Sequence, residues 1–128
     1  MSVTDATLLI ENTTNLFILD VRTLDEYNAG HIEKAYLIPY DQIESRASEL
    51  PENKSTPILV YCRSGTRSAI ASSTLVNLGY TEIFNLEKGF NDWKDQNNKN
   101  TSFSLYFIIP FFILSLILIW KRNKLNSS

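Results

Sequence analysis

The sequence alternates short apolar runs with segments in which apolar residues recur every three or four positions. Runs of the first kind are typical of strands, and segments of the second kind are typical of helices. The predicted strands cover residues 15–21, 34–39, 57–62 and 81–86. The predicted helices cover residues 23–30, 41–50, 67–79 and 89–96. Buried strands separated by helices predict an α/β fold, with helices on both faces of a central parallel sheet.

The composition changes abruptly after the last predicted helix. A polar stretch is followed by 18 residues without a charge, which begin at Phe103 and end at Trp120. As a helix, 18 residues at about 1.5 Å each cover most of a hydrocarbon core of about 30 Å, and basic residues then follow. The sequence therefore predicts a folded domain over residues 1–95, a polar linker over 96–102, one transmembrane helix over 103–120 and a basic tail over 121–128.

The flanking segments bear on the side of the membrane. The N-terminal segment "MSVTDATLLIEN" lacks a basic region, so it does not predict a signal peptide. A folded head before a C-terminal anchor is typical of tail-anchored proteins, whose head stays in the compartment of synthesis. The basic tail favours the opposite orientation, but Lys88, Lys94 and Lys99 before the span make the local count roughly even. We expect a single-pass membrane protein with a cytoplasmic catalytic domain.

Charge and cysteine usage exclude several classes of protein. Fourteen acidic and nine basic residues precede Phe103, and the other three basic residues follow Trp120. A mildly acidic head without a basic cluster argues against nucleic-acid binding, which needs several converging cations. The chain has one cysteine, Cys62, so neither an internal disulfide nor a cysteine-rich metal site is expected. We expect no metal and no cofactor.

Cys62 begins the segment "CRSGTR" at the end of the third predicted strand, and sites in such folds lie at the carboxyl ends of strands. Gly65 permits a backbone whose N–H groups point inward, and the following helix adds the partial positive charge of its N-terminus. Arg63 and Arg67 add full charges. Further donors are Ser64, Thr66 and Ser68. These features favour a thiolate nucleophile and an anionic ligand, although a free cysteine can also be a small buried hydrophobe.

Three segments resemble a single-domain rhodanese-like sulfurtransferase. Residues 16–40, "LFILDVRTLDEYNAGHIEKAYLIPY", are similar to the family's Asp-Val-Arg, Glu-Tyr and Gly-His-Ile stretch. Residues 58–80, "ILVYCRSGTRSAIASSTLVNLGY", are similar to its active-site loop and following helix. Residues 85–93, "NLEKGFNDW", are similar to its closing Gly-Gly-x-x-x-Trp segment, with Lys88 in place of the first glycine. The resemblance implies a three-layer fold with a central parallel sheet flanked by helices.

The resemblance also implies a reaction. Cys62 would attack the outer sulfur of a small anionic donor such as thiosulfate, and a Cys62 persulfide would pass the sulfur to cyanide or a thiol. The residues implied to bind substrate are Arg63, Ser64, Gly65, Thr66 and Arg67. Among them, we expect Arg63 to steer the donor and Arg67 to maintain the shape and charge of the loop.

Three residues near the implied site suggest structural roles. Asp20 and Arg22 flank Val21 at a strand end, where a buried ion pair would hold neighbouring loops together. His31 is the only histidine, and in "AGHIEKA" we interpret it as a structural hydrogen-bonding residue of a turn. The resemblance implies no catalytic histidine.

Two alternatives remain open. Cysteine phosphatases and arsenate reductases use a related thiol, but phosphatases place five residues between the cysteine and the arginine, whereas four separate Cys62 from Arg67. The other alternative is a non-catalytic rhodanese-like module that binds a protein partner or relays sulfur within a membrane complex. Retained partner binding without the Cys62 thiol would favour that module.

Overall fold

Four parallel strands form the central sheet of the computed structural model, which describes residues 1–125 apart from the side chains of residues 103–112 and 114. The strands are β1 (Phe17–Asp20), β2 (Tyr36–Leu37), β3 (Ile58–Tyr61) and β4 (Ile83–Asn85). They lie in the order β2-β1-β3-β4, and each neighbouring pair is parallel. The sheet predicted from the alternation of strands and helices is therefore confirmed.

Helices begin where the sequence supplies a cap or a change of backbone direction. The helices are α1 (Val3–Asn12), α2 (Leu24–Ala29), α3 (Thr66–Asn77) and α4 (Gly89–Leu125). The Ser2 hydroxyl accepts the Asp5 N–H at the start of α1, and the Thr23 hydroxyl accepts the Glu26 N–H at the start of α2. Such N-caps satisfy backbone donors that lack a partner within the helix. Helix α1 is absent from the sequence-based prediction.

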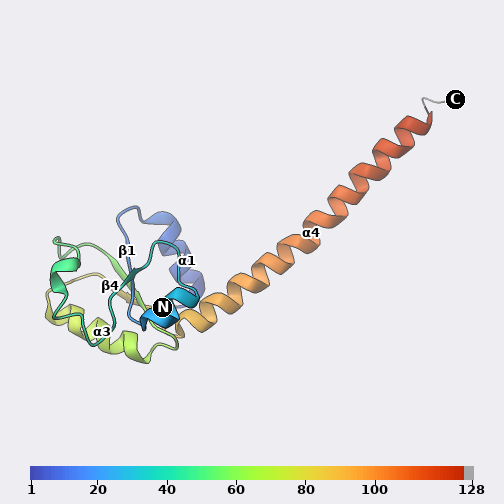
Figure 1. The fold of residues 1–128 in the computed structure, drawn as a ribbon. Coiled ribbons are helices and arrows are strands. Elements are labelled where there is room, and N and C mark those ends of the chain that lie inside the picture. Colours follow the sequence, from blue (N-terminus) through green and yellow to red (C-terminus); the bar gives the residue numbers. More distant parts are fainter. Residues whose placement is uncertain (126–128) are drawn as a thin grey trace. The chain divides into compact units, whose positions relative to one another are not determined.

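Two apolar clusters lie on the two faces of the sheet, because alternate residues of a strand point to opposite sides. On one face, Leu19, Val60 and Cys62 pack with residues of α3. On the other face, Ile18 and Leu59 pack with residues of α1 and with the beginning of α4. Figure 1 shows α1 and α3 on opposite sides of the strands. The expected arrangement of a parallel sheet flanked by helices is thus present.

The predicted helix over residues 41–50 is wrong. This segment consists of turns followed by one short 3₁₀ helix, Ala47–Glu49. Most backbone hydrogen bonds here span three residues, as from the Ala47 N–H to the Glu44 carbonyl and from the Glu49 N–H to the Arg46 carbonyl, so the backbone forms turns and 3₁₀ geometry in place of an α-helix. The apolar residues of the segment still reach the core, since Ile43 is completely buried.

The C-terminal segment is helical in the part that the structure describes. Met1–Lys94 form one compact unit and Asp95–Ser128 a second, and α4 continues without a break through residues 96–102, predicted as a linker. The predicted span from Phe103 to Trp120 falls largely on residues whose side chains lie outside those described. Among the described residues, no helix has the length and the apolar content needed to cross a membrane.

Candidate active site

Cys62 follows the last residue of β3, at the carboxyl end of the central strands. Its side chain is 1% exposed and belongs to the apolar cluster on the α3 side of the sheet. The Gly65 N–H donates to Cys62 Sγ at 3.1 Å. Gly65 has a φ of 103°, a conformation that favours glycine, and it is the residue directly before α3. The predicted loop therefore turns a backbone donor onto the thiol.

Opposing effects act on the pKa of the Cys62 thiol. Burial raises it, but hydrogen bonds from the Ser68 side chain and from the amides of Ser68, Ser64 and Gly65 outweigh burial, so the pKa lies below its ordinary value. The Ser68 hydroxyl has one proton, and it donates to the Gly65 carbonyl oxygen at 3.0 Å. A charged acceptor forms the stronger hydrogen bond, so we expect this hydroxyl to donate to Cys62 Sγ instead when Cys62 is a thiolate. The loop favours a thiolate.

Glu87, just before α4, and the first residues of α4 pack against the Cys62 loop. A Cβ added at Gly65 would lie 1.8 Å from the Glu87 carbonyl oxygen, and one added at Gly89 would lie 2.5 Å from the Arg63 carbonyl oxygen. The first turn of α4 donates from the Phe90 N–H to the Cys62 carbonyl at 2.8 Å. These contacts are possible only because two glycines meet backbone of the opposite segment. The shape of the loop is therefore determined partly by residues 22 to 28 positions later in the chain.

Lys88 departs from the family pattern without disturbing this contact. The only described residue other than glycine with a positive φ is Lys34, so Lys88 keeps an ordinary backbone conformation. Its side chain is exposed. The second glycine of the pattern, Gly89, has a φ of 65° and makes the close approach.

Arg67 is held by a residue that the sequence analysis did not single out. Its two terminal nitrogens donate to the two carboxylate oxygens of Glu26, at 2.8 and 2.9 Å. The hydrogen bonds to Arg67 lower the pKa of Glu26, and those to Glu26 raise the pKa of Arg67, to which the nearby Cys62 thiolate also contributes. The Thr-x-x-Glu spacing from Thr23 to Glu26 predicts a helix cap and gives no indication of the contact with α3.

The residues of the loop differ in their exposure to solvent. Arg63, Ser64 and Thr66 are exposed, whereas Gly65 is buried and Arg67 is partly buried. Within the described part of the chain, the Arg63 guanidinium has no hydrogen bond or ion pair. Arg63 is thus free to meet an incoming anion, and Ser64 contributes to the thiolate through its amide.

Asp20 and Arg22 form a buried ion pair at the end of β1. Arg22 Nη2 donates to Asp20 Oδ2 at 2.6 Å and to the Gly30 carbonyl at 2.7 Å. The Tyr61 hydroxyl donates to the same Asp20 oxygen at 2.7 Å and accepts the Ile32 N–H at 3.0 Å. Burial, followed by the charge of Asp20, raises the pKa of Tyr61. This network joins β1, β3 and the loop before β2 beneath the Cys62 loop.

His31 lies in the turn after α2. Its Nδ1 is 2.9 Å from the Tyr27 carbonyl oxygen, and its ring stacks on that of Tyr27 with centroids 3.7 Å apart. The side chain is exposed. These contacts hold the ring against the end of α2, and the structural role of His31 stays a prediction.

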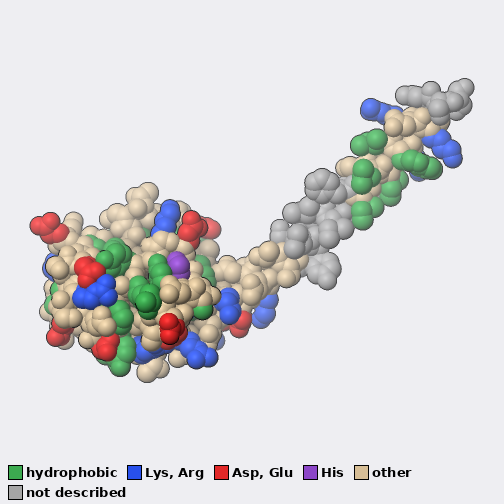
Figure 2. Space-filling view, viewed as in Figure 1, with side chains coloured by type: hydrophobic (Ala, Val, Ile, Leu, Met, Phe, Trp, Pro, Cys, Tyr) green, Lys and Arg blue, Asp and Glu red, His purple; other side chains and the backbone are tan. Residues whose placement is uncertain are grey.

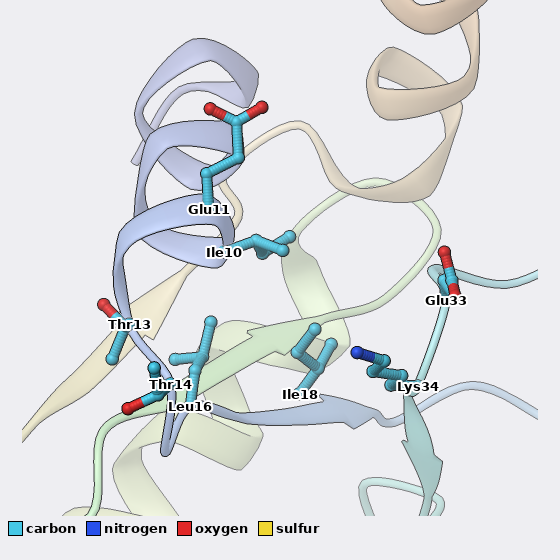
Figure 3. Close-up of a pocket in the computed structure, with 8 residues that line it drawn as sticks. All are labelled: Ile10, Glu11, Thr13, Thr14, Leu16, Ile18, Glu33 and Lys34. Atoms are coloured by element: carbon cyan, nitrogen blue, oxygen red, sulfur yellow. The ribbon is translucent and has the colours of Figure 1, made fainter.

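A cavity of about 380 Å³ lies away from this site. Figure 3 shows its lining, which comes from the end of α1, the start of β1 and the loop before β2. Ile18, one of the lining residues, points to the α1 side of the sheet, whereas Cys62 points to the α3 side. The cavity and the thiol therefore lie on opposite faces and near opposite ends of the strands.

Comparison with known proteins agrees with this geometry. The chain is 41% identical to the uncharacterized protein YqhL of Bacillus subtilis over 76 residues, which are 59% of each protein. It is 34% identical to a sulfurtransferase of Allochromatium vinosum over 84 residues, which are 66% of this chain and 77% of that one. It covers 44% of YrkF, a second Bacillus subtilis protein, so it spans about half the length of these first two relatives.

A solved structure and a family model agree with these relatives. A rhodanese-like domain protein from Staphylococcus aureus superimposes with a TM-score of 0.66 at 29% identity, over 73% of this chain and 88% of that one. The model of the rhodanese-like domain matches residues 2–96, which include every strand of the described sheet and the Cys62 loop. The chain therefore belongs to the rhodanese-like domain family.

Proposed function

We propose that this protein is a sulfurtransferase that carries sulfane sulfur as a persulfide on Cys62. The observation that carries the proposal is the 3.1 Å hydrogen bond from the Gly65 N–H to Cys62 Sγ, within a loop that lowers the pKa of the thiol. The names of several relatives support the reaction class, including the sulfurtransferase of Allochromatium vinosum and the thiosulfate sulfurtransferase GlpE of Tolumonas auensis.

The first half-reaction loads the thiol. The Cys62 thiolate attacks the outer sulfur of thiosulfate, and a sulfur–sulfur bond forms at Sγ. The sulfur–sulfur bond of thiosulfate breaks, and its electron pair leaves with sulfite. The negative charge then lies on the terminal persulfide sulfur, where the loop amides that stabilise the thiolate can donate to it. Because the thiolate is already favoured, this step needs no general base.

The second half-reaction unloads the persulfide. A cyanide ion or an acceptor thiolate attacks the terminal sulfur, the bond to Sγ breaks, and the electron pair returns to Sγ as thiolate. No net oxidant or reductant is consumed, and the two half-reactions give ping-pong kinetics. In this scheme, exposed Arg63 attracts the anionic donor. Arg67, whose charge is partly balanced by Glu26, maintains the geometry of the loop.

The size of the loop favours sulfur over phosphate. Four residues separate Cys62 from Arg67, and the Gly65 backbone is in close contact with Glu87. Widening the ring would therefore require the closing segment to move as well. This argues against the phosphatase and arsenate reductase alternative.

The test is the mass of the full chain after incubation with thiosulfate. We expect the wild-type protein to gain the mass of one sulfur atom and Cys62→Ser to gain none. Ser64→Ala, which removes an exposed hydroxyl but keeps its amide, is the matched control and should gain the same mass as wild type. An equal gain in Cys62→Ser would contradict the proposal, because the sulfur would then not be on Cys62. No gain in wild type with thiosulfate or a persulfide donor would also contradict it and would favour a docking module.

A second part of the proposal concerns attachment to a membrane, with the catalytic domain on the cytoplasmic side. Its support is the uncharged sequence from Phe103 to Trp120 and the exposed apolar side chains of α4 before the basic residues, visible in Figure 2. Such a segment would bring Cys62 close to membrane-protein acceptors. Resistance of the membrane-bound full chain to alkaline carbonate extraction tests attachment. Protease digestion of right-side-out and inverted vesicles tests the side.

A further inference from the structure

A groove beside the Cys62 loop is lined by residues that the proposed reaction does not use. It has a volume of about 230 Å³ and lies between α3 and the turns after β2. The lining residues are Tyr40, Asp41, Ile43, Glu44, Ile70 and Thr74. Ile43 is completely buried, whereas Tyr40 and Ile70 are 36% and 51% exposed. These two exposed side chains offer apolar surface on either side of the hollow, against which an apolar side chain of a partner can pack.

The groove lies close to the thiol. The Tyr40 N–H donates to the Val21 carbonyl, and the Val21 N–H donates to the carbonyl of Tyr61, the residue before Cys62. Neighbouring hydrogen-bonded segments of a sheet lie about 4.8 Å apart. The Tyr40 and Tyr61 backbones are two such spacings apart, which is roughly 10 Å. Ile70 lies about one turn after Thr66, the first residue of α3. A chain that reaches Cys62 from this side passes over the groove.

The charge of the groove is negative. Asp41 and Glu44 are exposed, and in the part of the chain that the structure describes neither carboxylate has a hydrogen bond or an ion pair. None of the lining residues is cationic. The two arginines nearest in sequence are engaged elsewhere, since Arg46 pairs with Glu49 and Arg67 pairs with Glu26. These carboxylates repel an anionic donor, so the groove suits a different partner.

We propose that this groove docks the sulfur acceptor, and that the acceptor is a protein thiol flanked by basic and apolar side chains. The inference rests on the proposed sulfurtransferase function and adds the chemical class of the acceptor. Lysine or arginine side chains next to the acceptor cysteine meet Asp41 and Glu44, and an apolar side chain packs between Tyr40 and Ile70. The donor enters at Arg63, so donor and acceptor are recognised by separate surfaces of opposite charge.

The test uses a short peptide in which one cysteine is flanked by two lysines and two leucines. The full chain is loaded with thiosulfate, and loss of the persulfide to the peptide is followed by mass. We expect the double variant Asp41→Asn/Glu44→Gln to slow this transfer roughly fivefold at low salt, with a smaller difference at high salt. Transfer to cyanide, a small anion that does not need the groove, should not be slowed. The Glu11→Gln/Glu33→Gln control has the same net charge but alters the opposite cavity, so it should behave as wild type.

A peptide with glutamates in place of the lysines provides the second comparison. Each peptide is compared between protein variants, so differences in peptide thiol reactivity cancel. The double variant should not slow transfer to the acidic peptide. Equal rates of wild type and the double variant with the basic peptide would overturn the proposal.

A binding measurement separates failure of the groove from failure of the sulfurtransferase function. The lysine peptide is made with serine in place of cysteine, and its binding to the unloaded full chain is measured by fluorescence anisotropy. We expect the Asp41→Asn/Glu44→Gln and Ile70→Ser variants to bind it several-fold more weakly than wild type. Equal binding by all variants overturns the docking proposal whether or not the chain forms a persulfide. Absence of a persulfide in wild type overturns the reaction alone.

Discussion

Glu26 on α2 binds Arg67 on α3 through both carboxylate oxygens, at 2.8 and 2.9 Å, although 41 positions separate the two residues. The pair connects α2, the helix after β1, with α3, the helix after β3. Both side chains are a little over one quarter exposed. The ion pair is therefore less screened by solvent than one on the open surface.

A double-mutant cycle measures this connection. Glu26→Gln and Arg67→Gln should each destabilise the fold, and the cycle should give a coupling free energy of about 1 kcal/mol, typical of a partly exposed bidentate pair. Denaturant unfolding of the four proteins is the measurement. Asp25→Asn, an exposed neighbour in the same helix turn, is the matched control and should show no coupling to Arg67.

The same pair predicts a direction of pH dependence. The pKa of Glu26 is lowered by Arg67, so the contribution of the pair is complete above the ordinary pKa of 4.5 and is lost as the pH falls through the lowered value. The coupling free energy should therefore be constant from neutral pH to about pH 5 and then fall on acidification. A coupling that rises on acidification would contradict the assignment.

Ser68→Ala tests the stabilisation of the thiolate. Removing the buried hydroxyl removes a donor to Cys62, so the pKa of the thiol should rise and the pH profile of alkylation should move to higher pH. At neutral pH we expect alkylation by iodoacetamide to slow about fivefold, the equivalent of one hydrogen bond of about 1 kcal/mol. In Ser64→Ala the amide remains, and the profile should not move. Identical profiles for Ser68→Ala and wild type would remove Ser68 from the site.

Gly65→Ala should be among the most damaging single substitutions in the domain. The added Cβ would meet the Glu87 carbonyl at 1.8 Å, in addition to the cost of a positive φ. We expect a loss of more than about 3 kcal/mol in the free energy of unfolding. Gly79→Ala separates the two effects, since Gly79 has a φ of 95° but nothing within 4 Å of an added Cβ. That control should cost only about 1 kcal/mol.

Tyr61→Phe tests the buried network beneath the loop. The substitution leaves the Ile32 N–H without an acceptor and removes one donor from Asp20. Leaving such groups buried and unpaired should lower the free energy of unfolding by about 2 kcal/mol. Tyr36→Phe removes an exposed hydroxyl bonded to Glu49 and should cost much less. Denaturant unfolding of both variants decides between a structural network and an incidental contact.

Much of the site follows from local sequence. An apolar run that ends in Cys62, a glycine three residues later and a helix after that glycine determine a loop that folds onto its own thiol, because all of these groups are neighbours in the chain. The parallel sheet also follows from the alternation of strands and helices. The prediction for residues 41–50 failed because the backbone there forms hydrogen bonds that span three residues, and the spacing of apolar residues does not distinguish such turns from an α-helix.

What only the tertiary structure decided are the contacts between distant segments. In the sequence, the spacing of Glu26 from Thr23 indicates only a helix cap. The packing of α2 beside α3 is what brings Glu26 to Arg67. In the sequence, Gly89 indicates only the start of a helix. The close approach of two backbones shows that neither Gly89 nor Gly65 has room for a side chain. The groove at Tyr40 and Ile70 likewise depends on folding, because burial and charge at a surface are properties of segments that meet in space.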